Sequence, residues 1–454
     1  MPLTALCEHS ALSPESPLYT LHLLTTAEPL PSKIAVTGFN GKIGQVRFIT
    51  SVTGTLEGAC VGLGDNTDPW ALAGAIDALP EGVWQIAALP KGCDANFVAL
   101  TWALGIYRFT RYRSAPTDAR ARLLWPQNAD RPLVTRTIEA VERVRDMVNT
   151  PAEDMGPDHI EGLVRDLAAH TGAQVDVITG PDLLEKGYPA IHAVGRASHR
   201  PPRLIDLRWG DKNAPKVTLV GKGVCFDTGG LDLKPSSGMR LMKKDMGGAA
   251  HAFALAGMIM DAALPVCLRL LIPAVDNAVA GNAMRPGDIL QTRKGLTVEV
   301  SNTDAEGRLI LADALAEGDR EAPDLMIDFA TLTGAARVAL GPELPALFCR
   351  DAALANTLVT AGHNTHDPVW SLPLWKGYRA QLDSPVADLD NAPEGGMAGA
   401  ILAALFLAEF VSDTTPWVHL DVYAWNQKPR IGRPVGGEAM ALRAIFSYLC
   451  DRFS

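Results

Sequence analysis

Four acidic residues could hold a metal ion together: Asp227, Asp245, Asp304 and Glu306. Carboxylates brought close to one another repel, and each is pushed towards its protonated form unless a multivalent cation compensates. Oxygen ligands without a thiolate suit Mg²⁺, Mn²⁺ or Zn²⁺. A carboxylate-rich metal site is therefore one hypothesis. The other is a set of solvated loops and a charged helix start, which such residues form more often.

These acids lie in or near two glycine-containing segments. The first reads VGKGVCFDTGG at 220–230, and the second is the octapeptide NTDAEGRL at 302–309. The first segment follows an apolar run, so Lys222 and Asp227 are expected at the exit of a strand, where glycine permits close backbone approach. In the octapeptide, an extended Asp-x-Glu would aim two carboxylates at one centre. Arg308, with its permanent charge, could hold an anion bidentately.

The elements that must position these residues alternate along the chain from residue 157 onwards. Apolar runs predict strands at 174–178, 204–208, 217–220, 266–272, 296–301, 325–329 and 417–422. Helices are predicted at 159–170, 249–263, 309–317, 352–361 and 399–411. The α/β order predicts a mostly parallel central sheet covered by helices on both faces. Active sites in such sheets lie beyond the carboxyl ends of the strands.

The N-terminal part predicts a smaller α/β domain without a phosphate-binding glycine motif. Its expected strands are 32–36 and 82–89, and its expected helices are 69–79 and 97–108. Apolar residues at helical spacing predict a further helix at 131–148 that connects the two parts. The expected division is an N-terminal α/β domain at 1–130, a connecting helix at 131–155 and a catalytic domain at 156–454.

Composition narrows the function classes. The formal net charge of -10 argues against general nucleic-acid binding, which requires a surplus of Lys and Arg on one face. The seven cysteines are odd in number and dispersed, which favours a reducing compartment over a disulfide framework. The N-terminal residues lack the pattern of a signal peptide, and the most apolar helical stretches are too short to span a membrane. The cytoplasm is the expected location.

The motifs together resemble those of the leucine aminopeptidase (cytosol aminopeptidase) family, which are dinuclear metal exopeptidases. NTDAEGRL matches the family's hallmark in full, and GKGxxFDxGG matches 221–230, with Thr228 where Ser is common. Lys234 and Asp245 follow Asp227 by seven and eighteen residues, as in the family. Further matching segments lie at 149–151, 331–334 and 384–388, so the resemblance spans roughly residues 140–450.

The resemblance implies a metal-dependent aminopeptidase with two divalent ions, Mn²⁺ or Zn²⁺, with Mg²⁺ or Co²⁺ as alternatives. The tightly held ion would be bound by Lys222, Asp227, Asp245 and Glu306, and the exchangeable one by Asp227, Asp304 and Glu306. A water or hydroxide bridging the metals would attack the peptide bond. Lys234 would polarise the scissile carbonyl, and Arg308 would hold a bicarbonate that acts as general base.

The same resemblance implies peptide substrates with a free N-terminus and a homohexamer. The pocket for the first side chain would be lined by Met242, Thr331, Leu332 and Gly334. The chain departs from well-known members at Tyr423 and Asn426. If these residues face the pocket, it is narrower and more polar. If they pack against the sheet instead, the pocket is unaffected, so the preference for leucine stays open. His419 is expected to be a structural hydrogen-bonding residue.

Two other functions stay open at this point. One is a scaffold or DNA-binding role, which the complete ligand set and the acidic charge disfavour and which a gel-shift assay would test. The other is a two-metal phosphoesterase, since carboxylate-rich dinuclear sites also hydrolyse phosphate esters. The full series of motifs disfavours it. Turnover of aryl phosphates without turnover of aminoacyl anilides would support it.

Overall fold

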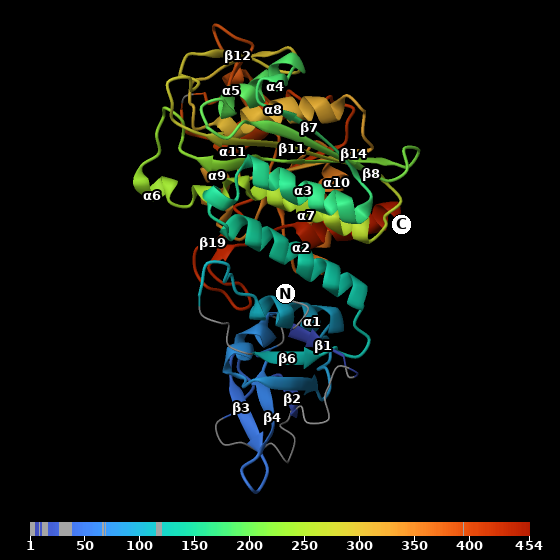
Figure 1. Cartoon of the computed structure of the whole chain (residues 1–454). Coiled ribbons are helices and arrows are strands. Elements are labelled where there is room, and N and C mark those ends of the chain that lie inside the picture. The colour runs from blue at the N-terminus through green and yellow to red at the C-terminus, as the bar shows by residue number, and fades with distance from the viewer. Residues whose placement is uncertain are drawn as a thin grey trace. The chain divides into compact units, whose positions relative to one another are not determined.

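The structure, a computed structural model, describes residues 5–8, 10, 17–26, 39–65, 68, 70–114, 120–393 and 395–454. The chain forms two compact units. The smaller comprises Met1–Glu142 and Asn426–Val435, and the larger comprises Arg143–Trp425 and Gly436–Ser454. Both are mixed α/β units, as the sequence predicts (Figure 1).

The smaller unit is built on a six-stranded sheet, in the order β1-β6-β5-β2-β4-β3. Its strands are β1 (Leu6–Cys7), β2 (Leu18–Leu24), β3 (Val46–Thr50), β4 (Leu56–Gly62), β5 (Gly82–Ile86) and β6 (Ala121–Leu124). The 3-10 helix η4 (Ala71–Ala78) and the helix α1 (Ala95–Ile106) pack against each other. Asp94 caps α1 by accepting a hydrogen bond from the Phe97 amide. The strand expected at 32–36 lies outside the described residues.

The connecting helix predicted at 131–148 is α2 (Arg131–Asn149). Its end coincides with the sequence Asn149-Thr150-Pro151, where proline cannot continue a helix. The short 3-10 helix η5 (Ala152–Asp154) follows.

The larger unit contains a nine-stranded sheet, in the order β16-β15-β18-β14-β9-β11-β8-β7, with β10 also paired to β11. Strands β18, β14, β9 and β11 run parallel, whereas β8 and β15 run antiparallel to their neighbours β11 and β18. The bounds are β7 (Gln174–Thr179), β8 (Arg203–Trp209), β9 (Lys216–Gly221), β10 (Gly223–Asp227), β11 (Cys267–Asn277), β14 (Leu325–Ala330), β15 (Ala346–Cys349), β16 (Trp370–Ser371) and β18 (Trp417–Asp421).

Helices cover both faces of this sheet, as predicted (Figure 1). One face carries α3 (Pro157–Thr171) and α7 (Gly247–Asp261), and the other carries α5 (Pro189–Gly195) and α8 (Glu306–Asp319). The central strands are buried on both sides, which is why β14 reads as the continuous apolar run LMIDFA.

Shorter elements surround the sheet. The remaining helices are α4 (Asp182–Glu185), α6 (Ser236–Met239), η6 (Met242–Met246), α9 (Gly334–Leu340), α10 (Ala352–Asn364), η7 (Lys376–Leu382), α11 (Gly399–Ala408) and α12 (Leu442–Phe453). A separate three-stranded sheet contains β12 (Ile289–Gln291), β13 (Thr297–Glu299) and β17 (Leu389–Asp390). The strand before the octapeptide, β13, therefore lies outside the main sheet.

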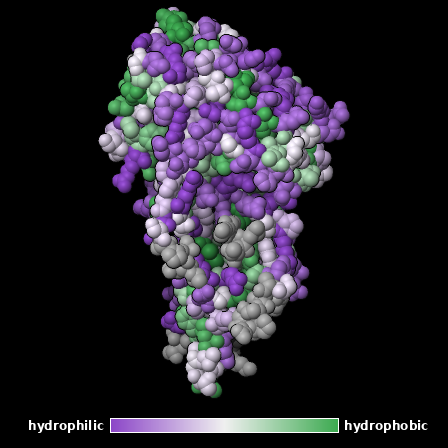
Figure 2. Space-filling view, in the orientation of Figure 1, coloured by the Kyte–Doolittle hydropathy of each residue, from purple (hydrophilic) through white to green (hydrophobic). Residues whose placement is uncertain are grey.

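The visible surface of the larger unit is mainly hydrophilic, with scattered hydrophobic residues (Figure 2). Among the described residues, no helix combines the length and the apolar character needed to cross a membrane.

Candidate metal and substrate site

The first set of charged side chains lies at strand ends. Lys222 joins β9 to β10, and Asp227 is the last residue of β10. Asp245 comes from the 3-10 helix η6, which directly precedes α7. The run at 243–245 could by its sequence have been only a charged helix start; it lies in η6, and Lys244 and Asp245 are buried there. The strand exit predicted for Lys222 and Asp227 is where the structure places them.

The octapeptide is not the extended segment that we expected. Asp304 lies in a turn, in which its amide donates to Asn302 Oδ1 at 2.8 Å. Glu306 is already the first residue of α8. The Asn302 side chain closes a local turn that competes with extended backbone, so the helix begins inside the motif. The two carboxylates therefore converge from a turn and a helix start.

Three carboxylates meet in the interior of the larger unit. Asp227, Asp245 and Glu306 are buried, and each offers an oxygen that lies within 4.8 Å of the others. Lys222 Nζ lies among them: it pairs with Asp245 and lies 3.2 Å from Glu306 Oε1. It also donates to the carbonyl of Thr331 at 2.8 Å. Residues from four separate segments thus share one charged centre.

The pKa values of the acidic residues in this centre are shifted in different directions. Burial and the charge of Asp227 raise the pKa of Glu306 to about 8. Burial and the same neighbour raise the pKa of Asp304 to about 6. Burial also acts to raise the pKa of Asp245, but the charges of Lys222 and Lys244 outweigh it and lower the pKa. Burial lowers the pKa of Lys222, yet the surrounding carboxylates produce a net increase.

Asp227 and Lys234 form the second part of the centre. Asp227 Oδ1 accepts hydrogen bonds from the Gly229 amide at 2.8 Å and from Asn277 Nδ2 at 2.9 Å. Its Oδ2 lies 2.8 Å from Lys234 Nζ, which also pairs with Asp304. Gly229 has a φ of 88°, a conformation that glycine adopts readily. The turn thereby brings Lys234 back to the carboxylates.

This donor set fits divalent cations. The centre is rich in buried oxygen ligands, and Glu306 Oε2 has no hydrogen-bond partner among the described residues. A buried acceptor without a partner is costly, and a cation would satisfy it. Burial and the neighbouring charge of Asp227 raise the pKa of Glu306, and a bound cation would offset both effects.

Arg308 lies in the first turn of α8, beside the centre. Its guanidinium donates to the carbonyl of Asn391 and lies 5.8 Å from the centroid of the Phe406 ring. Burial lowers its pKa to about 10. Its Nε has no partner among the described residues. Arg308 therefore lines the cavity and keeps one buried donor without a partner among the described residues.

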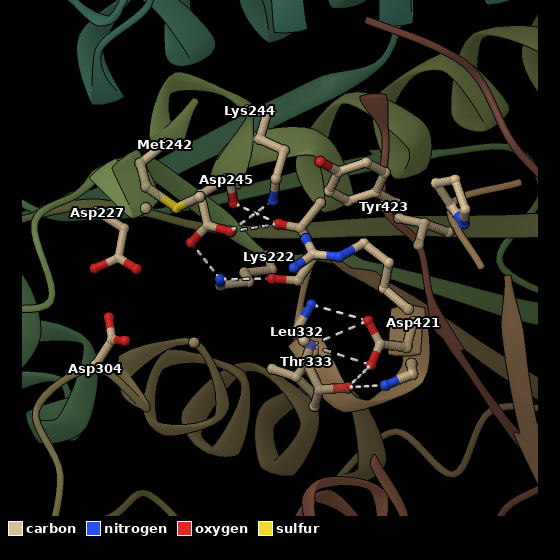
Figure 3. Close-up of a pocket in the computed structure, with 18 of the residues that line it drawn as sticks. Lys222, Asp227, Met242, Lys244, Asp245, Asp304, Leu332, Thr333, Asp421 and Tyr423 are labelled. Atoms are coloured by element: carbon tan, nitrogen blue, oxygen red, sulfur yellow. Dashed lines mark hydrogen bonds and ion pairs between the residues drawn. The ribbon is translucent and has the colours of Figure 1, made fainter. Parts of the chain in front are cut away.

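All these charged groups line one cavity of about 390 Å³. Of the residues expected to contact substrate, the cavity is lined by Met242, Thr331, Leu332, Gly334 and Tyr423. Figure 3 shows Asp227 and Asp304 at one end and Tyr423 at the other, with Asp245 and Lys222 between them. Asn426 does not belong to the described lining residues. Its amide donates to the carbonyls of Arg433 and Pro434 and thus stabilises a turn.

Comparison with known proteins identifies this architecture. The family model "Cytosol aminopeptidase family, catalytic domain" matches residues 142–446, and "M17 aminopeptidase, N-terminal domain" matches residues 22–126. The chain belongs to the cytosol aminopeptidase family. It is a metal-dependent aminopeptidase, so the family and the activity expected from the motifs are confirmed.

Individual relatives of this aminopeptidase span most of the chain. A protein of Roseiflexus castenholzii named "Probable cytosol aminopeptidase" is 41% identical over 369 residues, which cover 77% of this chain and 74% of the relative. "Peptidase B" of Cronobacter sakazakii is 42% identical over 322 residues, 69% of this chain and 75% of the relative.

Solved structures agree with this assignment. The crystal structure of a cytosol aminopeptidase from Coxiella burnetii has a TM-score of 0.92 and 49% identity, covering 96% of this chain and 98% of the other. The bottromycin maturation enzyme BotP, solved in complex with Mn, has a TM-score of 0.88 and 34% identity, covering 97% of this chain and 100% of the other.

The sequence did not single out every residue that lines the aminopeptidase cavity. Lys244, Arg337 and Asp421 also line it. Asp421 accepts hydrogen bonds from the amides of Leu332 and Thr333, at 3.0 and 3.1 Å, and so holds the loop after β14. The sequence could have indicated Asp421, because it stands at the carboxyl end of the strand β18, where active sites of such sheets lie. Lys244 could have been noticed because it directly precedes Asp245, a candidate ligand. No motif or spacing in the sequence indicates that Arg337 lines the cavity.

His419 has the structural role that was expected. Its Nδ1 lies 2.6 Å from Asp328 Oδ1, and Trp417 Nε1 donates to the other oxygen of the same carboxylate at 2.8 Å. The ring stacks on Phe348 at 5.7 Å between centroids. His419 is fully buried inside the sheet and is not among the residues that line the cavity.

Proposed function

We propose that this aminopeptidase binds two divalent ions at the carboxylate centre. Lys222, Asp227, Asp245 and Glu306 would hold the tighter ion, and Asp227, Asp304 and Glu306 would hold the exchangeable one. The convergence of three buried carboxylates within 4.8 Å carries the proposal. Bound together, the two ions would acidify a water that serves as the nucleophile near neutral pH. Mn²⁺ and Zn²⁺ are the favoured ions, with Mg²⁺ and Co²⁺ as alternatives.

The chain's own residues would orient the substrate. Asp245 would accept a hydrogen bond from the free N-terminal amine, which would also be a ligand of the tightly held ion. An internal amide nitrogen is not a comparable metal ligand, so only the first residue would be removed. Lys234 would donate to the scissile carbonyl and stabilise the negative charge that develops on its oxygen. The position of Lys234 Nζ, 2.8 Å from Asp227 at the carboxylate end of the cavity, supports this role.

Arg308 would hold a bicarbonate that moves the proton from the nucleophile to the leaving amine. Two observations support this assignment. Arg308 lines the cavity next to Glu306, and its Nε has no partner among the described residues. A guanidinium presents paired N–H donors that match the geometry of a planar anion.

The pocket for the first side chain would be formed by Met242, Thr331, Leu332, Gly334 and Tyr423. Their presence in the lining of one cavity supports this proposal. Tyr423 adds a large ring with a polar tip, which makes the pocket narrower, so preference for leucine is not assumed. The side-chain amide of Asn426 donates to the carbonyls of Arg433 and Pro434, so no role in the pocket is proposed for this residue.

We also propose a homohexamer in the cytoplasm, acting on peptides with a free N-terminus. The relatives' name, cytosol aminopeptidase, supports the location. Cys7, Cys60, Cys225, Cys267 and Cys349 are free thiols, which is typical of a reducing compartment.

The metal assignment is tested by chelation and substitution. Treatment with a chelator should abolish hydrolysis of a leucine anilide, and added Mn²⁺, Zn²⁺, Co²⁺ or Mg²⁺ should restore it. Asp304→Ala should lose one bound metal and nearly all turnover while keeping its circular-dichroism spectrum. The matched control is Asp232→Ala, because Asp232 bonds to the same motif through Thr303 but does not line the cavity. A folded Asp304→Ala enzyme with full activity would overturn the assignment.

A further inference from the structure

Two cations meet over one aromatic ring at the end of the cavity away from Asp227 and Asp304. Lys244 Nζ lies 5.3 Å from the centroid of the Tyr423 ring, and the Arg337 guanidinium carbon lies 4.8 Å from the same centroid. All three residues line the cavity. Figure 3 shows the Lys244 amine and the Tyr423 ring side by side. The metal chemistry proposed above uses neither cation.

The two cations differ in environment, and both lack a full counter-charge. Lys244 is buried, with 6% of its surface exposed. Its nearest carboxylate is Asp245 Oδ1 at 3.7 Å, and Asp245 is already engaged by Lys222 and Thr331. Arg337 lies on the exposed side of α9, and the described part of the chain contains no ion pair to it. Like charges that share one ring repel, so an anion bound between them is stabilised.

Lys244 and Arg337 lie where the side chain of a substrate's first residue would be bound. Lys244 is adjacent in sequence to Asp245, the acid proposed to receive the N-terminal amine. It also lies in the same 3-10 helix as Met242, which lines the proposed side-chain pocket. Since Lys244 Nζ lies 3.7 Å from Asp245 Oδ1 and Arg337 lines the same cavity, a side chain on the α-carbon next to that amine would lie within reach of both cations. The scissile carbonyl would lie towards Lys234, at the other end of the cavity.

We propose that Lys244 and Arg337 bind the side-chain carboxylate of an acidic N-terminal residue, so that the enzyme releases Glu and Asp faster than neutral residues of similar size. This inference rests on the aminopeptidase site proposed above and specifies its substrate class. Arg337 supplies a fixed charge and paired donors at the mouth of the pocket. Lys244 supplies a desolvated charge at its base, where an ion pair is least screened by water. Both charges lie against the ring of Tyr423, which also lines the cavity.

The test compares anilides of Glu, Gln and Leu on the metal-loaded enzyme. Glu and Gln have nearly the same shape, so their ratio of kcat/KM isolates the charge. We expect Glu to exceed Gln by about tenfold or more, as is usual for a charge-assisted contact. If none of the three anilides is hydrolysed with any metal, the aminopeptidase site itself is wrong. If Leu is hydrolysed but Glu is no better than Gln, only the present inference is overturned.

Variants assign the effect to the two cations. Arg337→Gln should reduce the Glu-to-Gln ratio about tenfold, and Arg337→Glu should reverse it and favour a Lys anilide. Lys244→Gln should reduce the ratio with bound metal unchanged. The matched control is Arg240→Gln, which removes an exposed positive charge close in sequence but outside the cavity lining. An equal loss in Arg240→Gln would show a general charge effect and overturn the proposal.

A second source of the carboxylate is the C-terminus of a dipeptide. Anilides lack this group, so a Glu preference among anilides comes from the side chain alone. Leu-Ala and its C-terminal amide provide the converse comparison. If Leu-Ala is cleaved faster than the amide, and Arg337→Gln removes that difference while the Glu-to-Gln ratio is unaffected, the cations bind the substrate's C-terminus and the proposal fails.

Discussion

At the scale of single residues, the candidate centre is a set of acids with different proton affinities. The pKa of Glu306 is raised to about 8 and that of Asp304 to about 6, whereas the pKa of Asp245 is lowered. The difference follows from the lysines, because Lys222 and Lys244 lie close to Asp245. Cations that bind here displace protons mainly from Glu306 and Asp304, so metal affinity should fall as the pH is lowered.

Arg308 is the residue whose proposed role is most easily separated from metal binding. Arg308→Ala removes the donors for bicarbonate but leaves every proposed metal ligand in place. We expect kcat to fall by about a hundredfold, in the range of a lost general base, with metal content unchanged by atomic absorption. Added bicarbonate should stimulate the parent enzyme and not the variant. Loss of both metals from Arg308→Ala would contradict this role.

At the scale of elements, the centre depends on how closely α8 approaches the segment between β9 and β10. A Cβ added at Gly307 would lie 2.2 Å from Lys222 Cε. The glycine therefore lets Lys222 extend past the start of the helix to reach Glu306 and Asp245. The requirement at this position is close packing, since Gly307 is an ordinary helical residue.

Gly307→Ala is expected to displace Lys222 and to destabilise the fold by about 1–3 kcal/mol, the usual range for overpacking. Activity should fall together with metal affinity. Gly162→Ala is the matched control, because Gly162 lies in α3 with nothing within 4 Å of the added Cβ. That change should be neutral or stabilise by up to about 1 kcal/mol. Denaturant unfolding of both variants measures the contrast, and equal stabilities would contradict the packing argument.

A second element-scale feature joins α7 to the segment before α12. His251 is fully buried, and its Nδ1 lies 2.6 Å from the Gly247 carbonyl. Its Nε2 accepts from the Met440 amide at 2.9 Å, so the ring is neutral. The ring also stacks on Phe329 of β14. Burial lowers the pKa of His251 to about 4, although the Gly247 carbonyl and Asp367 act in the opposite direction.

This arrangement predicts a pH-dependent stability. The pKa of His251 is about 4 in the folded chain, whereas an exposed histidine in the unfolded chain has a pKa of 6.5. As the pH falls, the unfolded chain therefore takes up the proton first. The contribution of neutral His251 to the free energy of unfolding is complete above the pKa of the unfolded chain. It is lost as the pH falls towards the pKa of the folded chain. The loss should reach about 2.5 kcal/mol between about pH 7.5 and about pH 4.5. In His251→Gln, the free energy of unfolding measured with denaturant should decrease less over this pH range. An equal decrease in the variant and the parent would exclude His251 as the cause.

At the scale of the whole molecule, the larger unit places its chemistry at the carboxyl ends of parallel strands. Lys222 follows β9, Asp227 ends β10 and Thr331 follows β14. Asp421 ends β18, the next strand in the sheet. The mostly parallel order therefore brings segments that are far apart in sequence to one edge. The two compact units and the two matched family models agree in dividing the chain into a smaller and a larger part.

The proposed homohexamer is a prediction at this scale. Sedimentation velocity should give a mass about six times that of the 48.4 kDa chain. The measurement should be repeated at several protein concentrations and at high salt, to separate a closed assembly from weak association. A stable monomer under all conditions would overturn the prediction.

Sequence by itself determined the family and the activity. It also named Lys222, Asp227 and Glu306 as candidate ligands, because the resemblance rests on local motifs that can be recognised before any fold is known. Apolar periodicity also predicted the central strands and the helices that cover them. It did not predict that Glu306 starts a helix, because a single asparagine side chain at 302 decides the turn before it.

Only the tertiary structure decided which distant residues share the cavity. Tyr423 and Asn426 are three positions apart, yet Tyr423 lines the cavity and Asn426 bonds to a turn. Arg337 and Lys244 come from different elements, yet both lie against the ring of Tyr423. Such contacts depend on strand order and side-chain packing between segments that are far apart in the chain, and no local pattern encodes them. The activity could therefore be inferred from sequence, whereas the proposed substrate preference required the fold.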